Sequence, residues 1–313
     1  MRVLFWGTSA FAAPSLNALI GEGFDVAGVV TQPDRPVGRS RSTRVAPVIK
    51  RIARAESLPV LQPERPRGAD FMAAVRDLAP EISVVVSYGH ILPAEVIDLP
   101  PHGTVNVHAS LLPRLRGASP IRAAIHEGLL ETGVTIMRMV PALDAGPIIL
   151  QARTPTSDDE TYGELEMRLS ELGALALVEA LTLIEMGQAT EHAQDDALAT
   201  YAGKVDRAAT RIVWSEDGGA VARHIRAYDP KPGAWTMLRA SPVKLFGARG
   251  TDEIDETHQP AVGAVLAIDE RGLVVATGAG AVCVAVAQPS GRKALPVQEW
   301  ARGRGVRVGD RFE

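Results

Sequence analysis

The sequence predicts a two-domain protein, in which an α/β domain with a largely parallel sheet is followed by a small all-β domain. The 313 residues are enough for about two domains of ordinary size. The first half alternates short, continuous apolar runs with helix-like stretches, as βαβ units do. The last third shows short apolar runs separated by Gly, Pro and Asp, a spacing that is typical of a small β-barrel or sandwich.

Apolar runs rich in β-branched residues begin the chain and recur, as expected of strands that are buried on both faces of a parallel sheet. They are Val3–Trp6, Val26–Val30 and Ile82–Val86, with further candidates at Val105–His108, Val134–Met139 and Ile148–Gln151. Helix-like stretches between the early runs are Pro14–Ile20, Ala46–Ala55 and Phe71–Leu78. This alternation predicts a doubly wound α/β domain.

A long helix is predicted to end this domain. Thr161 and Glu164 have the spacing of a capping box, and the helical pattern runs to about Met186, where Gly187 offers a C-cap. The residues that follow are mixed and polar, which is typical of a linker. We therefore expect a first domain over residues 1–189, a linker over 190–206 and a second domain over 207–313.

The second domain is predicted to contain one helix, Gly218–Arg226, and several short strands. The strand candidates are Ala234–Leu238, Val243–Phe246, Gly263–Ala267, Leu273–Thr277 and Ala281–Val286. Because turn residues separate them at short intervals, they favour a β-barrel or sandwich over further βαβ units.

Composition excludes several classes of protein. Apolar residues make up 46% and charged residues 22%, and the longest apolar runs fall far short of the roughly 20 residues that span a bilayer. Cys283 is the single cysteine, which excludes a disulfide framework and a cysteine-based zinc site. The N-terminus lacks the pattern of a secretory leader. We therefore expect a soluble, cytoplasmic monomer without a metal or a membrane partner.

Charge is distributed unevenly along the chain. The net charge is −4, but residues 207–313 carry 15 Lys and Arg against 12 Asp and Glu, which leaves 18 against 25 for residues 1–206. Within that acidic half, one stretch holds seven cations and no carboxylate. They are Arg35, Arg39, Arg41, Arg44, Lys50, Arg51 and Arg54. Such an island indicates an anionic partner, although a solvated loop has the same composition.

The glycine turn after the first strand does not predict a nucleotide site. Gly7 lacks the later glycines of a dinucleotide fingerprint, because Ser9 and Ala12 occupy those positions, and the phosphate-loop pattern is also missing. A tight strand-to-helix turn is the simpler interpretation, since glycine permits the turn at no steric cost.

Asn106 and His108 are more informative. The period of a strand directs both side chains to one side, at a strand end where open α/β sheets bind ligands. Asp144 follows a further strand. These groups suit acyl transfer without a covalent nucleophile, because the amide and a charged imidazole donate to a developing oxyanion, while the carboxylate orients the imidazole or accepts a proton. From spacing alone, a structural hydrogen-bonded pair explains Asn106 and His108 at least as well.

Longer segments around these residues resemble the folate-dependent formyltransferases. The resemblance is carried by Asn106–His108, Ser110–Pro113, Arg116–Pro120 and Leu143–Gly146. Further segments extend it along nearly the whole chain: Gly7–Pro14, Thr31–Pro36, Tyr88–Pro93, Ala199–Lys204, Ile225–Pro230 and Gln288–Lys293. The basic loop and the C-terminal segments are similar to those of the family members that act on tRNA.

The resemblance implies a Rossmann-like catalytic domain and an OB-like barrel that helps to hold tRNA. It implies transfer of the formyl group of 10-formyltetrahydrofolate to the α-amino group of methionyl-initiator-tRNA, for translation initiation. The catalytic residues would be Asn106, His108 and Asp144. Folate would contact Ser110, Leu111, Leu112 and Pro113, with Tyr88, Gly89, Ile91 and Leu92 in the pocket wall. The tRNA-binding residues would be Arg35, Arg39, Arg41, Arg44, Arg292 and Lys293.

The chain departs from the family pattern at two places. The basic loop is rich in Arg and Ser where lysine is expected, and we assign Arg41 to the first base pair of the acceptor stem. His90 stands where a different side chain is expected beside the pterin. Two other functions are considered. Formylation of a small amine leaves the basic loop unexplained, and RNA binding without catalysis requires a decayed catalytic set, whereas all three residues are present.

Overall fold

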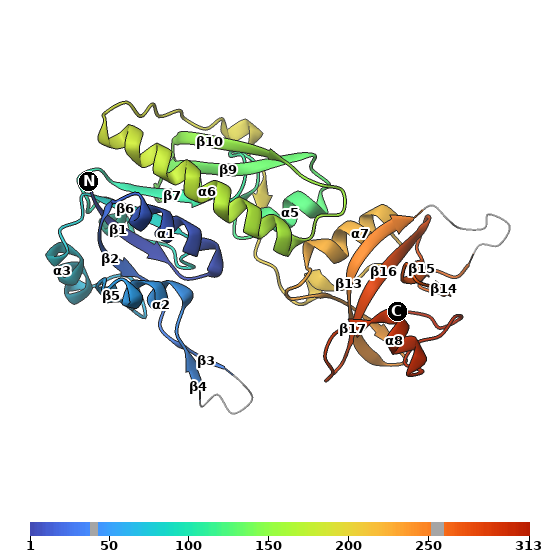
Figure 1. Cartoon of the computed structure of the whole chain (residues 1–313). Helices are drawn as coiled ribbons and strands as arrows, with labels where there is room; N and C mark the ends of the chain where they lie inside the picture. Colours follow the sequence, from blue (N-terminus) through green and yellow to red (C-terminus); the bar gives the residue numbers. More distant parts are fainter. Residues whose placement is uncertain (38–42, 252–259) are drawn as a thin grey trace. The chain divides into compact units, whose positions relative to one another are not determined.

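The computed structural model describes residues 1–37, 43–251 and 260–313, and the chain divides into two compact units (Figure 1). The N-terminal unit contains residues 1–117, 132–154 and 166–202. The C-terminal unit contains residues 118–131, 155–165 and 203–313. Within the described ranges, every helix is too short or too polar to traverse a bilayer.

A seven-stranded sheet forms the centre of the N-terminal unit, in the order β10-β9-β7-β6-β1-β2-β5. Its strands are β1 (Arg2–Gly7), β2 (Asp25–Val30), β5 (Val60–Leu61), β6 (Ile82–Val86), β7 (Thr104–His108), β9 (Glu131–Arg138) and β10 (Ile148–Pro155). The strands from β7 to β5 in this order are parallel, and β9 runs antiparallel to β7. The predicted Rossmann-like α/β sheet is confirmed, with an antiparallel edge that the apolar runs do not reveal.

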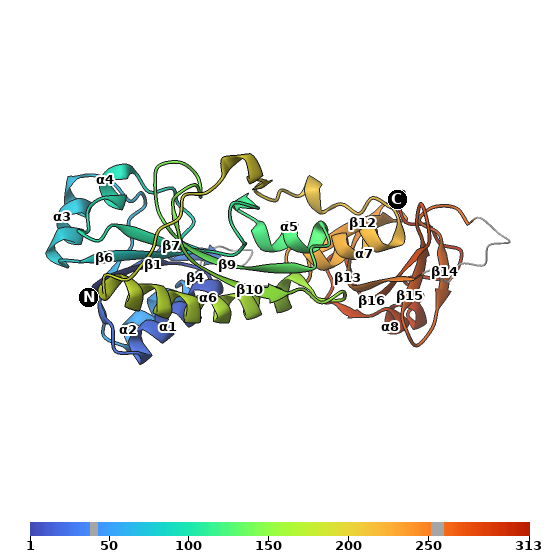
Figure 2. The ribbon, with the colours of Figure 1, turned by 90° about the horizontal axis from the view of Figure 1, so that it is seen from above.

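Helices cover both faces of this sheet, as Figure 2 shows. On one face lie α1 (Ala13–Gly21), α2 (Val48–Ala55) and α6 (Tyr162–Glu185), and on the other lie α3 (Ala69–Asp77) and α4 (Ala94–Ile97). Double coverage explains the continuous apolar sequence, since all residues of β6 are buried. The α6 helix packs closely on β7, because a Cβ atom at Gly173 would lie 3.0 Å from Cγ1 of Val107.

Both ends of α6 agree with the sequence prediction. The N–H group of Thr161 donates to Oε2 of Glu164 at 2.9 Å, and the N–H group of Glu164 donates to Oγ1 of Thr161 at 3.3 Å, which is a capping box. At the other end, Gly187 has a φ of 67° and its N–H group donates to the carbonyl of Ile184 at 3.0 Å. Local sequence therefore determines where this helix begins and ends.

The polar segment after α6, expected as a linker, is hydrogen-bonded to the N-terminal unit. It contains the short helix η2 (Asp196–Leu198) and the strand β11 (Tyr201–Ala202). The β11 strand pairs in parallel with β8 (Arg116–Gly117), and His192 forms a β-bridge with Ile148. Backbone atoms make these contacts, so composition did not reveal them.

An antiparallel sheet forms the C-terminal unit, in the order β12-β13-β16-β15-β14, with β17 paired to β16. Its strands are β12 (Ala234–Leu238), β13 (Ser241–Thr251), β14 (Val265–Ile268), β15 (Leu273–Ala276), β16 (Ala281–Pro289) and β17 (Leu295–Pro296). The C-terminal residues join its two edges, because Phe312 bridges to Leu238 in β12 and Arg311 bridges to Ala264 beside β14. The predicted small β-domain is confirmed.

Several short elements complete the two units. In the C-terminal unit they are α5 (Pro120–His126), η3 (Ala208–Thr210), α7 (Gly218–Ala227) and α8 (Val297–Arg302). In the N-terminal unit they are η1 (Ala10–Ala12) and the hairpin of β3 (Arg35–Val37) and β4 (Thr43–Val45). The residue pattern predicted α7 but not α5, and the two helices pack against each other. Helices as short as α5 provide too few turns for a clear period.

A buried histidine lies where α5 and α7 meet. His224 is 8% exposed, and its ring centroid lies 5.5 Å from that of His126 and 5.0 Å from that of Tyr228. Burial, followed by the nearby His126, lowers the pKa of His224 to about 4 from 6.5. The neutral imidazole is therefore the form that the folded C-terminal unit accommodates.

We predict that this histidine makes the protein acid-sensitive. A lowered pKa in the folded state stabilises the fold above pH 6.5, and that stabilisation is lost as the pH falls towards 4, by up to about 3 kcal/mol. Urea unfolding between pH 7 and pH 4 measures the loss. The variant His224→Phe cannot titrate and should lose less stability over this range, whereas the exposed-site control His102→Gln should follow the parent. Equal losses in all three proteins would contradict the prediction.

Candidate active site

The β7 strand directs the two predicted polar side chains to one face of the sheet. Val105 and Val107 are buried, and Val107 packs against α6, so Asn106 and His108 project from the opposite face. His108 is 5% exposed, whereas Asn106 is partly exposed. The carboxamide of Asn106 forms no hydrogen bond with any residue in the described ranges. It is therefore free to bind a ligand.

His108 lies between a carbonyl and a carboxylate. Its Nε2 atom lies 3.0 Å from the carbonyl oxygen of Leu115, and because a carbonyl only accepts, this nitrogen carries a hydrogen. Its Nδ1 atom lies 3.8 Å from Oδ2 of Asp144, close enough for an ion pair but too far for a direct hydrogen bond. The two side chains are only 6% and 15% exposed, so little water competes for these contacts.

Asp144 lies in the loop after β9, a neighbouring strand that ends beside the start of β7, whereas His108 lies at the end of β7. Because β9 is antiparallel to β7, β9 ends beside the start of β7, where the N–H group of Met139 donates to the carbonyl of Thr104 at 2.8 Å. The following loop turns back, and Asp144 has a φ of 48°. Its Oδ2 atom accepts from the N–H group of Gly117 at 2.8 Å. Thus the acid and the imidazole meet by tertiary folding.

Gln194 holds the loop that carries Asp144, and the sequence analysis missed it. Its Nε2 atom donates to the carbonyls of Asp144 and Gly146, both at 2.8 Å, while its Oε1 atom accepts from the guanidinium of Arg116. Arg116 is 3% exposed and also pairs with Asp196 at 2.7 Å. Gln194 and Asp196 come from the segment expected as a linker, where single polar side chains form no recognisable pattern.

In the first segment predicted to contact folate, polar groups form hydrogen bonds with other parts of the protein. The hydroxyl of Ser110 donates to a loop carbonyl at 2.6 Å, and the N–H group of Leu112 donates to Oγ1 of Thr135 at 3.1 Å. Ser110 and Leu112 are 1% and 4% exposed. Leu111 and Pro113 are partly exposed, so their side chains form the accessible surface of this segment.

The second predicted folate segment divides between core and surface. Tyr88 and Leu92 are 2% and 3% exposed, whereas Ile91 is 86% exposed. Gly89 has a φ of 91°, and a Cβ atom there would lie 2.6 Å from Nε2 of Gln32. Burial raises the pKa of Tyr88 to about 12. Within this segment, therefore, Tyr88 belongs to the core and Ile91 is an exposed apolar side chain.

The second predicted folate segment follows β6, one of the two strands between which the sheet reverses its winding, and in open α/β sheets such a reversal forms a crevice. The crossover through α1 leads from β1 to β2, and the crossover through α3 leads back to β6 on the other side of β1. Hydroxyl groups tie the two strand ends together. Thr8 donates to the carbonyl of Tyr88 at 2.9 Å, and Ser9 donates to Ser87 at 2.7 Å. Open α/β sheets bind their ligands at such a crevice.

The predicted RNA-binding cations are described only in part. Arg35 and Arg44 are exposed on the β3–β4 hairpin, Arg292 and Lys293 are exposed between β16 and β17, and Arg39 and Arg41 lie outside the described residues. One cation of the basic island, Lys50, is not available to bind an anionic partner. Lys50 is 8% exposed, and its Nζ atom lies 2.7 Å from Oδ1 of Asp34, whose pKa is lowered by hydrogen bonds from Gln62 and Lys50. Asp34 precedes the island by one residue and neutralises this lysine.

The described part of the chain contains no cluster of side chains that could bind a metal ion. Over those ranges, no group of three or more His, Cys, Asp or Glu side chains is arranged to hold a metal ion. The single cysteine, Cys283, lies in β16 of the C-terminal unit.

The chain belongs to the formyl transferase family, since residues 1–181 match formyl transferase and residues 204–305 match the formyl transferase C-terminal domain. It is similar to two proteins named methionyl-tRNA formyltransferase. The one from Moorella thermoacetica is 44% identical over 303 residues, which are 97% of this chain and 96% of that protein. The one from Aromatoleum aromaticum is 44% identical over 313 residues, which are 100% of this chain and 97% of that protein.

A solved structure shows the same fold at low sequence identity. HypX from Aquifex aeolicus, in complex with tetrahydrofolic acid, matches with a TM-score of 0.68 at 20% identity. The match covers 96% of this chain but only 46% of HypX, so this chain corresponds to less than half of that protein. At this identity the likeness concerns the fold alone.

We predict that Gly117→Ala weakens the site by straining its backbone. Gly117 has a φ of 115°, and a Cβ atom would lie 2.6 Å from the carbonyl oxygen of Ala202. The strain should cost about 1–3 kcal/mol and displace the N–H group that holds Asp144. Thermal and urea unfolding measure the cost. The control is Gly203→Ala, because a Cβ atom there would meet no atom within 4 Å. The prediction is wrong if both variants unfold like the parent.

Proposed function

We propose that the protein transfers the formyl group of 10-formyltetrahydrofolate to the α-amino group of methionyl-initiator-tRNA, a step that prepares translation initiation. The observation that carries the proposal is the buried imidazole of His108, placed between a carbonyl and the carboxylate of Asp144 on a strand that also presents the free amide of Asn106. Relatives named for this activity are 44% identical along the chain.

The reaction requires no covalent nucleophile on the enzyme. Folate supplies the formyl carbon as its N10 amide. The α-amino nitrogen bonds to that carbon, the bond from the carbon to N10 breaks, and one proton passes from the amine to the departing nitrogen. The protein therefore has to stabilise charge on the formyl oxygen, direct the proton and exclude water, which would otherwise compete with the amine.

In our proposal, Asn106 and His108 stabilise the charge that develops on the formyl oxygen. The Asn106 amide has no competing partner in the described ranges, so it is ready to donate. The Nε2 hydrogen of His108 already points at an acceptor, the carbonyl of Leu115 at 3.0 Å. A formyl oxygen replaces that carbonyl as acceptor. Preorganised donors of this kind need little rearrangement during the reaction.

Asp144 is proposed to act with either of its two oxygens. Its Oδ2 atom accepts from the N–H group of Gly117 and faces Nδ1 of His108 at 3.8 Å, so it helps to keep the imidazole oriented. Its Oδ1 atom forms no hydrogen bond with a residue in the described ranges. This second oxygen is free to accept the amine proton, directly or through a water molecule.

Folate is proposed to lie against the apolar surfaces near the reacting groups. Leu111 and Pro113 are partly exposed beside β7, and Ile91 is 86% exposed after β6. Tyr88, Gly89 and Leu92 support that wall, whereas Ser110 and Leu112 keep their segment in shape. A flat pterin ring suits such surfaces, because apolar contacts supply affinity while a few polar groups fix its orientation.

RNA recognition is proposed for cations from both domains. Arg35, Arg39, Arg41 and Arg44 would contact the acceptor end, and Arg292 and Lys293 would contact the RNA from the C-terminal domain. Guanidinium groups suit phosphates, because they donate two parallel hydrogen bonds. We propose domain boundaries at 1–189, 190–206 and 207–313. We also propose that the protein is cytoplasmic. A monomer suffices for the reaction, since one chain supplies all three proposed catalytic residues.

We predict that Asn106→Ala lowers kcat by a factor of about 10²–10³, because one donor to the developing charge is lost. The KM for the charged tRNA should change little, since Asn106 is proposed to act on the formyl oxygen. Steady-state formyl transfer measures both constants. Asn17→Ala, an exposed asparagine on α1, is the control and should match the parent. A kcat within threefold of the parent for Asn106→Ala would remove this residue from the proposed mechanism.

We predict that Arg41→Ala combined with Arg44→Ala raises the KM for charged tRNA and makes binding less sensitive to salt. Each phosphate contact adds about one unit to the slope of log affinity against log salt, so this slope should fall by about two. The control is Arg67→Ala with Arg76→Ala, which removes the same charge from exposed positions elsewhere. An unchanged KM and slope would show that the basic loop does not bind RNA.

One assay separates the proposed function from its alternatives. The protein is mixed with 10-formyltetrahydrofolate and either charged initiator tRNA or small amines, at two salt concentrations. Transfer to tRNA that falls with added salt supports the proposal. Transfer to a small amine regardless of salt would instead indicate a small-molecule formyltransferase, and salt-sensitive tRNA binding without turnover would indicate an RNA-binding protein.

A further inference from the structure

A row of outward-facing side chains crosses three neighbouring strands of the C-terminal unit. Trp235 of β12 lies opposite Lys244 of β13, and Lys244 lies opposite Gln288 of β16. Burial alternates along β12, so that Ala234 and Thr236 are in the core and Trp235 is on the outer face. An aromatic ring, an ammonium group and an amide are therefore neighbours on one face of the sheet.

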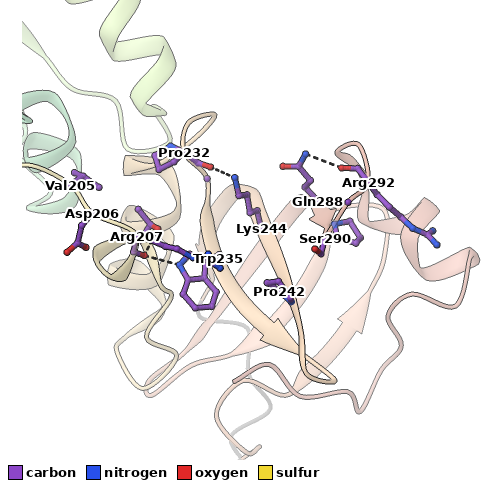
Figure 3. Close-up of a pocket in the computed structure, with 14 residues that line it drawn as sticks. Val205, Asp206, Arg207, Pro232, Trp235, Pro242, Lys244, Gln288, Ser290 and Arg292 are labelled. Carbon is purple, nitrogen blue, oxygen red and sulfur yellow. Dashed lines mark hydrogen bonds between the residues drawn. The ribbon is translucent and has the colours of Figure 1, made fainter. Parts of the chain in front are cut away.

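This row lines a pocket of about 610 Å³, shown in Figure 3. The pocket is bounded by Val205–Arg207 and Pro232–Gly233 on one side and by the turn Ser290–Arg292 on the other. All of its lining residues belong to the C-terminal unit. A volume of this size is ordinary for a site that binds a small molecule.

Trp235 is held in place with cations around its ring. Its Nε1 atom donates to the carbonyl of Arg207 at 3.0 Å, which fixes the ring against rotation. The guanidinium carbons of Arg207 and Arg211 lie 5.2 Å and 5.6 Å from the ring centroid. The ring is nevertheless only partly buried. A partly exposed aromatic ring beside cations matches the two halves of a nucleotide, a flat base and a phosphate.

Lys244 is positioned by the backbone of Pro232 and Gly233 at the rim of the pocket. Its Nζ atom donates to the carbonyl of Pro232 at 2.6 Å, which leaves two of its three hydrogens for a ligand. Gly233 makes room for this side chain, because a Cβ atom there would lie 2.8 Å from Cδ of Lys244. The backbone at this rim thus holds the ammonium group over the pocket, as Figure 3 shows.

Positive charge predominates around the pocket. Among its lining residues, all of which the structure describes, Arg207, Lys244 and Arg292 are cations and Asp206 is the one acid. The carboxylate of Asp206 is used locally, since it accepts from the N–H group of Ala209 at 2.8 Å. The side chain of Arg292 points outward at the rim (Figure 3), so Arg207 and Lys244 are the cations that face a ligand.

We propose that this pocket binds a single unstacked nucleotide of the RNA substrate. The base stacks on Trp235, and the phosphate lies on Lys244 and Arg207. Gln288 reads the base edge, because its Nε2 atom donates to the carbonyl of Arg292 at 3.2 Å and its Oε1 atom remains to accept from a base amino group. A nucleotide within a duplex is already stacked on its neighbours, so the ligand comes from a single-stranded part of the RNA.

The identity of the RNA in this inference rests on the proposed function. Formyl transfer by the parent protein is therefore measured first, and a parent that binds charged tRNA but transfers no formyl group would overturn only the proposed function. The pocket is then tested by the binding of charged initiator tRNA itself, which does not depend on turnover.

The stacking part is tested with Trp235→Leu and Trp235→Phe. Loss of the aromatic ring should weaken tRNA binding about tenfold, with kcat at saturating tRNA unchanged. Phenylalanine cannot donate to Arg207 but can still stack, so Trp235→Phe should retain most of the affinity. The matched control is Met237→Ala, which alters the same outer face of β12 outside the pocket. Thermal unfolding of each variant establishes that it is folded.

The phosphate part is tested with Lys244→Met, which should lower the salt slope of tRNA binding by about one, whereas the Trp235 variants should leave that slope unchanged. Arg302→Met, an exposed cation on α8, is the control. Ultraviolet cross-linking should join a single-stranded nucleotide to the peptide that contains Trp235. The inference is overturned if folded Trp235→Leu and Lys244→Met bind tRNA within twofold of the parent, or if the cross-link falls elsewhere.

Discussion

The carboxylate of Asp144 is the contact on which the candidate site depends, because it joins segments that are distant in the sequence. Its Oδ2 atom accepts from the N–H group of Gly117 at 2.8 Å and lies 3.8 Å from Nδ1 of His108. Gly117 belongs to β8, which is paired with β11, so strand pairing determines where the acid lies. Gln194 donates to the carbonyl of Asp144, which has a left-handed conformation that few non-glycine residues adopt.

The layered sheet explains why this contact forms where it does. Helices bury both faces of β6 and β7, so polar side chains emerge only near strand ends and in the crevice between crossovers. Asn106 and His108 occupy that position on β7, and the carbonyl of Leu115, in the loop before Arg116, lies 3.0 Å from Nε2 of His108. A dry surrounding makes each polar contact stronger and each missing partner more costly. The rigid scaffold therefore supports the geometry that acyl transfer requires.

Recognition of a large anionic substrate is compatible with an acidic protein, because the field near a surface depends on local charge. The net charge is −4, yet cations gather on the β3–β4 hairpin and around the Trp235 pocket. Pairing removes some of them from this role, as Lys50 shows with Asp34. Around the Trp235 pocket, Lys244 is held by the carbonyl of Pro232, and Arg207 and Arg211 lie beside the Trp235 ring, contacts that orient charge without neutralising it.

The sequence by itself determined the type and order of most elements. Buried strands such as Ile82–Val86 are mostly apolar, and the capping box of Thr161 and Glu164 acts within a few residues. It also identified Asn106, His108 and Asp144 as candidate residues, but not Gln194, which holds the loop of Asp144. Only the tertiary structure decided that β9 is antiparallel and that its loop brings Asp144 to His108. Strand pairing depends on contacts between distant segments, and local patterns of residues do not encode which segments meet.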